Sequence, residues 1–212
     1  MDKLIDLAEI FIKNKLCIHL SDGHDFDHTC RVVNHALDLC DEIPGADRMI
    51  VHLAALLHDV ARPQEFQSQG RIDHAIAGAE IARDFLREHT SGEIADRVAE
   101  AIAQHRFRSG NKPSSLEAEI LYDADKLDSL GAVGIARAFM FASQTGAKLH
   151  NSREEALANP PYSKHDTAYR EYLVKLSLLP EKMLTAPGKL RAEKLYGFME
   201  IFFDQLNSEI FR

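Results

Sequence analysis

The chain has 212 residues, a length that suits one domain, 1–212, with a substantial buried core. Its 25 basic and 33 acidic side chains give a net charge of −8 with histidine neutral, which argues against a generally basic surface that grips nucleic acid. No apolar run approaches the roughly 20 residues that span a membrane, and the N-terminal stretch has no signal-peptide core. The cysteines lack a Cys-x-x-Cys spacing, so we expect reduced thiols and a cytoplasmic protein.

Helical spacing of apolar residues dominates the chain, without a β-hairpin signal or an internal repeat. We therefore predict an all-α fold. Pro63 is expected to end the third helix, and the sixth helical region is expected to break or loosen near Gly131 and Gly134. The predicted helices, in chain order, lie around residues 4–11, 32–39, 53–60, 73–89, 94–105 and 117–141.

The last third of the chain divides into an irregular stretch and a helical end. Residues 144–166 carry Pro160 and Pro161 among mixed polar residues, and they are predicted to be mostly irregular. Two interpretations stay open for this stretch, a flap over a cleft and a plain connector. Residues 167–212 are expected to form C-terminal helices. Their strongest amphipathic pattern, at 195–206, favours a helix that docks on the core over one that binds a partner.

The most informative local feature is Asp59, which follows His58 directly at the end of an apolar helical stretch. An aspartate beside Ala, Leu and Val needs compensation, which a cation supplies. Imidazole and carboxylate groups are the usual ligands of divalent transition metals. His28 and Asp125 would complete a four-ligand set from three helices, a common way to build a metal site in a helical bundle. For His58 taken alone, the competing interpretation is a hydrogen-bonded core histidine.

Three segments carry a resemblance to a known family: HDFDHTCRV, LAALLHDVARP and DADKLDSLGAVGIARAF. In this order they resemble the HD-domain superfamily of metal-dependent phosphohydrolases, and the match runs over core motifs at 24–139, more than half of the chain. DADKLDSLGA is similar to a subgroup of uncharacterised HD hydrolases that often end in a similar helix. The resemblance implies an HD-domain helical bundle with a C-terminal docking helix. It also implies metal ligation by His28, His58, Asp59 and Asp125.

Two neighbouring acids, Asp123 and Asp128, compete with Asp125 for the last ligand position. The ADKLDS stretch is similar to the ADRLHN segment of ppGpp hydrolases, in which the aspartate after the alanine is the ligand. This similarity favours Asp125. Asp128, one helical turn later, is then expected to hydrogen-bond a ligand or to contact the substrate.

Two further histidines, His74 and His105, have two open roles. In HD-GYP phosphodiesterases, which this chain resembles in part, histidines at comparable places bind a second metal. His74 matches through its His-x-x-x-Gly context, whereas His105 lacks the adjacent histidine of that family. Each is therefore a candidate ligand of a second metal or a candidate substrate-side histidine.

Two arginines are candidates for binding a phosphate. Arg62 lies one turn after Asp59, so on a continuing helix it projects from the same side. It matches the position of a phosphate-contacting lysine in HD-GYP enzymes. Arg106, directly after His105, is the second candidate. Enzymes that hydrolyse ppGpp carry an acidic pair soon after their His-Asp, where this chain has Val-Ala-Arg-Pro, and this departure argues against ppGpp hydrolysis.

These expectations combine into one function with two open alternatives. A divalent metal activates water and offsets charge on phosphate oxygens, so we expect a phosphohydrolase that acts on a phosphate mono- or diester of a small metabolite or nucleotide. Histidine-rich ligation favours Mn, Fe, Co, Ni or Zn over Mg, with one or two ions bound. The alternatives are a mixed-valent di-iron oxygenase on the same scaffold and a non-catalytic nucleotide or metal sensor. A homo-oligomer is compatible with the sequence. The expected catalytic residues are Asp59, Arg62, His74, His105 and Asp128.

Overall fold

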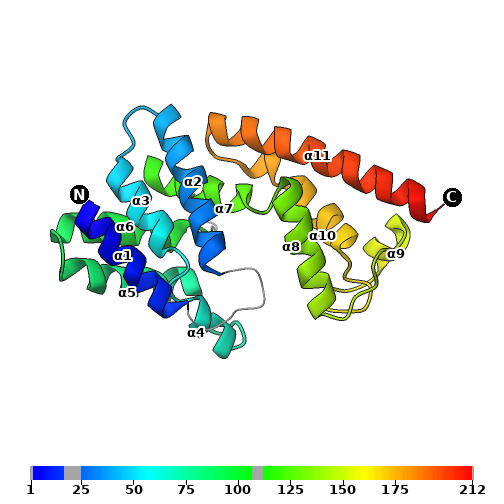
Figure 1. The fold of residues 1–212 in the computed structure, drawn as a ribbon, viewed down its shortest axis with the longest axis horizontal. Coiled ribbons are helices and arrows are strands. Elements are labelled where there is room, and N and C mark those ends of the chain that lie inside the picture. The colour runs from blue at the N-terminus through cyan, green and yellow to red at the C-terminus, as the bar shows by residue number, and fades with distance from the viewer. Residues whose placement is uncertain (1, 17–24, 107–111, 212) are drawn as a thin grey trace. The chain divides into compact units, whose positions relative to one another are not determined.

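The computed structural model describes residues 2–16, 25–106 and 112–211. All regular elements among these residues are helices, which confirms the predicted all-α class (Figure 1). The chain divides into two compact units, residues 1–125 and 126–212. The single-domain organisation stays a prediction, and residue 24, where the predicted motif region starts, lies outside the described residues. Among the described residues, none of the helices has the length and apolar character that spanning a membrane requires.

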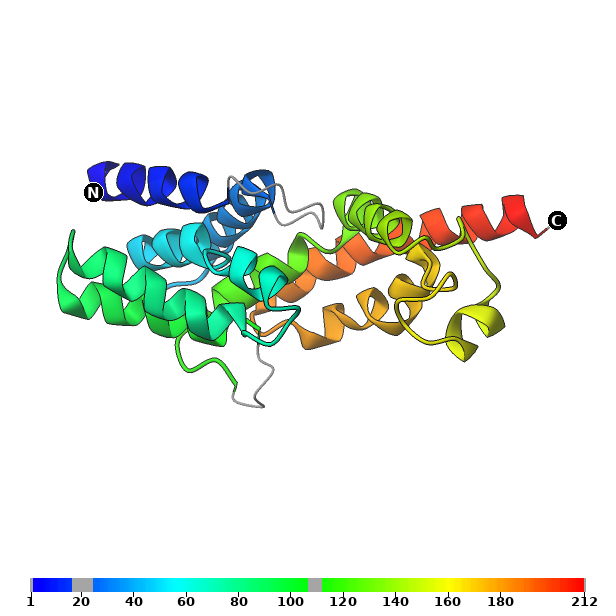
Figure 2. The ribbon, with the colours of Figure 1, turned by 90° about the horizontal axis from the view of Figure 1, so that it is seen from below.

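The first unit is built around α3, a helix that is buried on nearly every side. It packs against α1, α2 and α6, while α5 and α6 lie side by side in both views (Figure 1, Figure 2). Seven of its ten residues are buried, as expected of a helix with an apolar surface all round. The helices of this unit are α1 (Asp2–Lys15), α2 (Phe26–Glu42), α3 (Arg48–Leu57), α4 (Arg62–Gln67), α5 (His74–Arg87), α6 (Gly92–Gln104) and most of α7 (Leu116–Leu127).

The third helix ends earlier than the sequence pattern predicts. Helix α3 stops at Leu57, residues 58–61 form turns, and a new helix, α4, starts at Arg62. Pro63 is therefore not the stop of α3 but part of the first turn of α4, where its missing N–H needs no partner. The prediction that one helix continues through Arg62 was wrong. The turns let two consecutive residues, His58 and Asp59, leave the helix and face the same region.

In the second unit, α8 begins after the predicted break. Gly131 starts α8 with a φ of +64°, a left-handed conformation that glycine adopts without strain. Helix α11 packs against α8 and buries Met199 and Phe203, as expected of a docking helix. It is longer than the predicted 195–206. The helices of this unit are α8 (Gly131–Gln144), α9 (Arg153–Ala158), α10 (Ala168–Val174), α11 (Ala186–Ile210) and two short 3₁₀ helices (Leu176–Leu178 and Pro180–Lys182).

Residues 144–166 contain one helix that the sequence pattern did not predict. Helix α9 is capped by Ser152, whose Oγ accepts a hydrogen bond from the backbone N–H of Glu155 at 3.2 Å. The rest of the stretch has little regular structure, as predicted. A role as a flap stays a prediction.

Candidate metal centre

His58 lies at the C-terminal end of α3, where its ring hydrogen-bonds a backbone carbonyl group of that helix. Its Nδ1 lies 2.8 Å from the carbonyl oxygen of Ala55, which belongs to the last turn and has no partner within the helix. We assign the proton to Nδ1 from this contact, so Nε2 presents its lone pair. The side chain is fully buried, and Nε2 has no hydrogen-bond partner among the described residues. A buried acceptor of this kind requires a partner, and a cation suits it.

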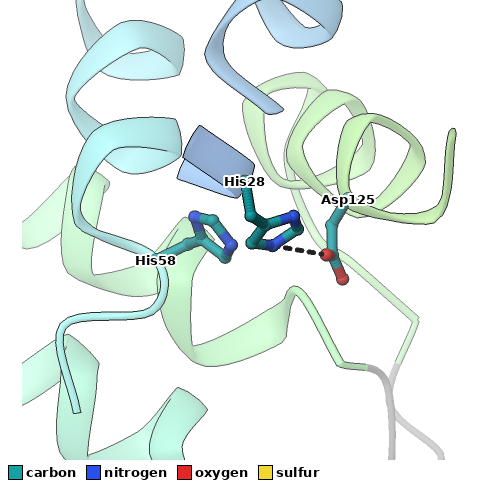
Figure 3. Close-up of side chains that lie close together, drawn as sticks. All are labelled: His28, His58 and Asp125. Carbon is teal, nitrogen blue, oxygen red and sulfur yellow. Dashed lines mark ion pairs between the residues drawn. The ribbon is translucent and has the colours of Figure 1, made fainter. Parts of the chain in front are cut away.

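His28, His58 and Asp125 form the first group of candidate ligands, one from each of three segments (Figure 3). Asp25 caps α2 by accepting a hydrogen bond from the backbone N–H of His28 at 2.9 Å, which fixes the start of the helix that carries His28. The ligand atoms of the group all lie within 4.8 Å of one another, and His28 Nε2 is 3.6 Å from Asp125 Oδ1. Asp125 is the partly exposed member, with 19% of its side chain accessible.

Asp59 lies between this group and a second one. Its Oδ2 is 3.7 Å from His28 Nε2 and 3.6 Å from His58 Nε2, whereas its Oδ1 is 3.0 Å from His74 Nε2. Atoms about 2.1 Å from one ion lie about 3.0 to 3.6 Å apart at ordinary coordination angles, so these separations suit shared ligation. Oδ2 is buried and has no hydrogen-bond partner among the described residues. One carboxylate is thus placed to bind a cation with each of its oxygens.

The second group consists of Asp59, His74 and His105, all of them buried. His105 lies at the end of α6, and its Nδ1 is 2.7 Å from the carbonyl oxygen of Ile102, so it repeats the arrangement of His58. His74 is the first residue of α5. Its Nε2 is 3.2 Å from His105 Nε2. The structure therefore brings together the two histidines whose roles the sequence left open.

Glu65 is a site residue that the sequence analysis missed. Its Oε2 accepts hydrogen bonds from Arg62 and from His74 Nδ1, the latter at 2.6 Å. Its Oε1 accepts one from Arg106 at 2.6 Å. A signal was present in the sequence, because Glu65 follows Arg62 at the i,i+3 spacing of a helix. The contact with Arg106, across 41 positions, had no such signal.

The surroundings favour the charged form of Asp59 and Glu65 and the neutral form of His58 and His105. Burial opposes the ionised form of Asp59, but His58, His74 and Arg62 outweigh it and hold the pKa of Asp59 well below its ordinary value. Burial likewise opposes ionisation of Glu65, yet hydrogen bonds from Arg106 and His74 lower its pKa to about 2. The pKa values of His58 and His105 are lowered, chiefly because burial disfavours the imidazolium form. Carboxylate and neutral imidazole are the forms that bind metals.

The lowered pKa values of His58 and His105 predict a pH dependence of stability in the metal-free protein. Below their ordinary pKa of 6.5, these two histidines bind protons in the unfolded chain but remain unprotonated in the folded chain. The free energy of unfolding should therefore be fully retained above that pH and should fall below it, by up to about 1.4 kcal/mol per pH unit for each histidine. Urea denaturation of chelator-treated protein between about pH 8 and about pH 5.5 measures this slope. His105→Gln should reduce the slope, and an unchanged slope would contradict the prediction.

The other predicted site residues lie as follows. Arg62 begins α4, its Nε is 4.0 Å from Asp59 Oδ2, and its Nη1 bonds Glu65. Asp123 is fully buried on α7 but belongs to neither group of candidate ligands. Asp128 belongs to the second unit, where it is buried and accepts a hydrogen bond from Arg137. Its role at the ligands or the substrate stays a prediction.

A helical fold that places the buried carboxylate of Asp59 beside two groups of His and Asp side chains is typical of His/Asp metal-binding helical domains. Over residues 25–130, half of its length, the chain matches the HD domain family. A relative described below is 36% identical over 90% of the chain. The chain therefore belongs to the HD-domain family.

Three relatives are informative. Bacillus subtilis YpgQ, an uncharacterised protein, is 36% identical over 197 residues, 90% of this chain and 86% of YpgQ. Its crystal structure in complex with ADP matches with a TM-score of 0.74 at 31% identity, over 98% of this chain and 95% of that one. An HD-superfamily hydrolase from Bacillus thuringiensis matches with a TM-score of 0.75 at 32% identity, over 98% and 97%. Dihydroneopterin 2',3'-cyclic phosphate phosphodiesterase of Methanocaldococcus jannaschii is 31% identical over 129 residues, 52% of this chain and 48% of that protein.

Proposed function

We propose that this protein is a metal-dependent phosphohydrolase that acts on a phosphate mono- or diester of a small metabolite or nucleotide. The observation that carries the proposal is Asp59, a buried ionised carboxylate whose two oxygens face two groups of buried imidazoles. The relatives support the choice of substrate class, because one was crystallised with ADP and another is a cyclic phosphate phosphodiesterase.

In such a reaction, some residues of the site would bind a cation and others would bind the substrate. His28, His58, Asp59 and Asp125 would hold the first divalent ion, and the imidazoles favour Mn, Fe, Co, Ni or Zn over Mg. A bound cation makes water more acidic and offsets negative charge on phosphate. Asp125 lies at the accessible edge of the group. The charge of Arg62, close to Asp59, favours an anionic substrate there.

The test is phosphate release from nucleotides, sugar phosphates and cyclic phosphodiesters with Mn²⁺, Co²⁺, Ni²⁺ or Mg²⁺ added in turn. Asp125→Asn removes one ligand charge at the accessible edge of the site, and we expect it to lower the rate by about 100-fold or more. The matched control is Asp96→Asn, an exposed aspartate of α6 that pairs with Arg83 and Arg87 and should leave the rate unchanged. Tight nucleotide binding without turnover under every metal would favour the sensor alternative instead.

The second group of ligands supports one further candidate, a mixed-valent di-iron oxygenase. That chemistry needs a second iron site, and Asp59, His74 and His105 are placed to provide one. The two candidates make opposite predictions about iron. Full hydrolytic activity in an iron-free preparation excludes the oxygenase, whereas inactivity across the whole phosphate panel, together with tightly bound iron, favours it.

A further inference from the structure

Glu65 lies at the junction of three segments that surround the second group of ligands. It belongs to α4, it contacts His74 at the start of α5, and it contacts Arg106 just after the end of α6. Only 13% of its side chain is accessible, and 4% of that of His74. A partly buried carboxylate at such a junction can determine how the neighbouring side chains are oriented.

The contact between Glu65 and His74 defines where His74 carries its proton. An ionised carboxylate only accepts hydrogen bonds, so from the 2.6 Å separation between Oε2 and His74 Nδ1 we assign a proton to Nδ1, which the guanidinium groups of Arg62 and Arg106 also approach at 3.1 and 3.2 Å. His74 Nε2 then faces the other candidate ligands, at 3.0 Å from Asp59 Oδ1 and 3.2 Å from His105 Nε2. His105 Nε2 is also a lone pair, because its Nδ1 proton goes to the Ile102 carbonyl. Asp59, His74 and His105 thus offer ligand atoms that all lie within 4.8 Å of one another, an arrangement in which one cation can contact all three.

Glu65 itself is held in place from both sides. Arg62 and His74 bond Oε2, and Arg106 bonds Oε1, so neither oxygen can turn toward the ligands without breaking a charge-assisted hydrogen bond. Arg106 is tied in turn to Asp73, the N-terminal cap of α5, at 3.3 Å. Among the described residues, Glu65 belongs to neither candidate ligand group. It acts through His74, not as a ligand.

We propose that Glu65 is the positioning residue of a second cation, which Asp59, His74 and His105 bind more tightly because the Glu65 carboxylate orients the His74 ring. Carboxylates that accept the outer N–H of a metal-bound histidine fix its ring and raise its basicity, and their loss weakens metal binding by about 10 to 100-fold. The inference rests on the metal centre of the proposed function but not on the reaction. We expect the binding of the second cation to depend on Glu65, because Glu65 contacts His74, which belongs to the second group.

The experiment is titration of the metal-free, full-length protein with Mn²⁺ or Co²⁺, with stoichiometry from calorimetry and coupling between two Mn²⁺ ions from electron paramagnetic resonance. We expect two cations per chain in the wild type. Glu65→Gln keeps an acceptor but loses the charge, and Glu65→Ala loses both. The second cation should weaken by about 10-fold in the first variant and about 100-fold in the second, with the first cation unchanged. His74→Ala serves as the benchmark for a lost second site.

The matched control is Glu80→Gln, an exposed glutamate on the same helix as His74, which should retain both cations. A Glu65 that merely supports the fold would lower both affinities and the melting temperature together, and that result would overturn the proposal. So would a wild type that binds one cation, or a Glu65→Ala protein that keeps two at unchanged affinity. If the protein hydrolyses none of the phosphate compounds, the number of bound cations can still be measured. The two proposals can therefore be refuted independently of each other.

Discussion

Replacing Asp59 with alanine is expected to abolish hydrolysis and to remove bound metal from both groups. Its Oδ2 faces the first pair of imidazoles and its Oδ1 faces His74, so one substitution takes a ligand from two cations. A loss of about 4 kcal/mol of transition-state stabilisation corresponds to a rate about 1,000-fold lower. Phosphate release and metal content, measured on the same preparation, check the prediction.

The isosteric variant Asp59→Asn separates charge from shape. It keeps the size of the side chain but offers a weaker, neutral oxygen, so both metal content and rate should lie between those of the wild type and the alanine variant. Circular dichroism establishes whether each variant is folded. Wild-type rate and metal content in a folded Asp59→Ala protein would be incompatible with the role given to this residue.

Among the glycines of the described residues, Gly134 is the one at which replacement by alanine should cause the largest loss of stability. A Cβ at this position would lie 2.1 Å from the carbonyl oxygen of Ser129 and 2.4 Å from its carbonyl carbon. Because both are backbone atoms, the turn before α8 has to move. We expect a cost of about 2 to 3 kcal/mol or more, which corresponds to a melting temperature lower by about 5 °C or more.

Gly197→Ala is the matched control in the same unit. Gly197 lies inside α11, and an added Cβ would meet no atom within 4 Å. Alanine is the better helix former, so this variant should gain about 0.5 to 1 kcal/mol. Thermal melts of the two variants, recorded by circular dichroism, should therefore move in opposite directions. A melting temperature of Gly134→Ala equal to that of the wild type would disprove the clash.

The sequence predicted those parts of the structure that depend on local spacing. Apolar periodicity located most of the helices, and the glycines near 131 located the break before α8, because Gly131 readily adopts the left-handed conformation that it has at the start of α8. Helix α9 was missed although Ser152 and Glu155 form the pattern of a capping box. Pro63 was misread because proline ends one helix and begins another equally well.

Local sequence motifs identified several residues of the candidate site. Contacts between residues from distant segments of the chain could not be predicted. His28, His58 and Asp125 were singled out from three segments, and the structure brings them together. Whether His74 and His105 lie together could not be decided, since that depends on how the ends of α5 and α6 meet. Glu65 was missed although its i,i+3 spacing from Arg62 was visible, because its other two partners lie nine and 41 positions away.

Two of the candidate ligands, His58 and His105, are anchored by hydrogen bonds to the carbonyl groups of their own last helical turns. Each ring is therefore immobilised when its helix forms, before any ion arrives. Most of the rotational entropy that a free imidazole would lose on capture has already been lost during folding. Metal uptake should accordingly resemble the filling of a rigid chelator, with little structural adjustment and with a rate governed by how fast the ion sheds its hydration water.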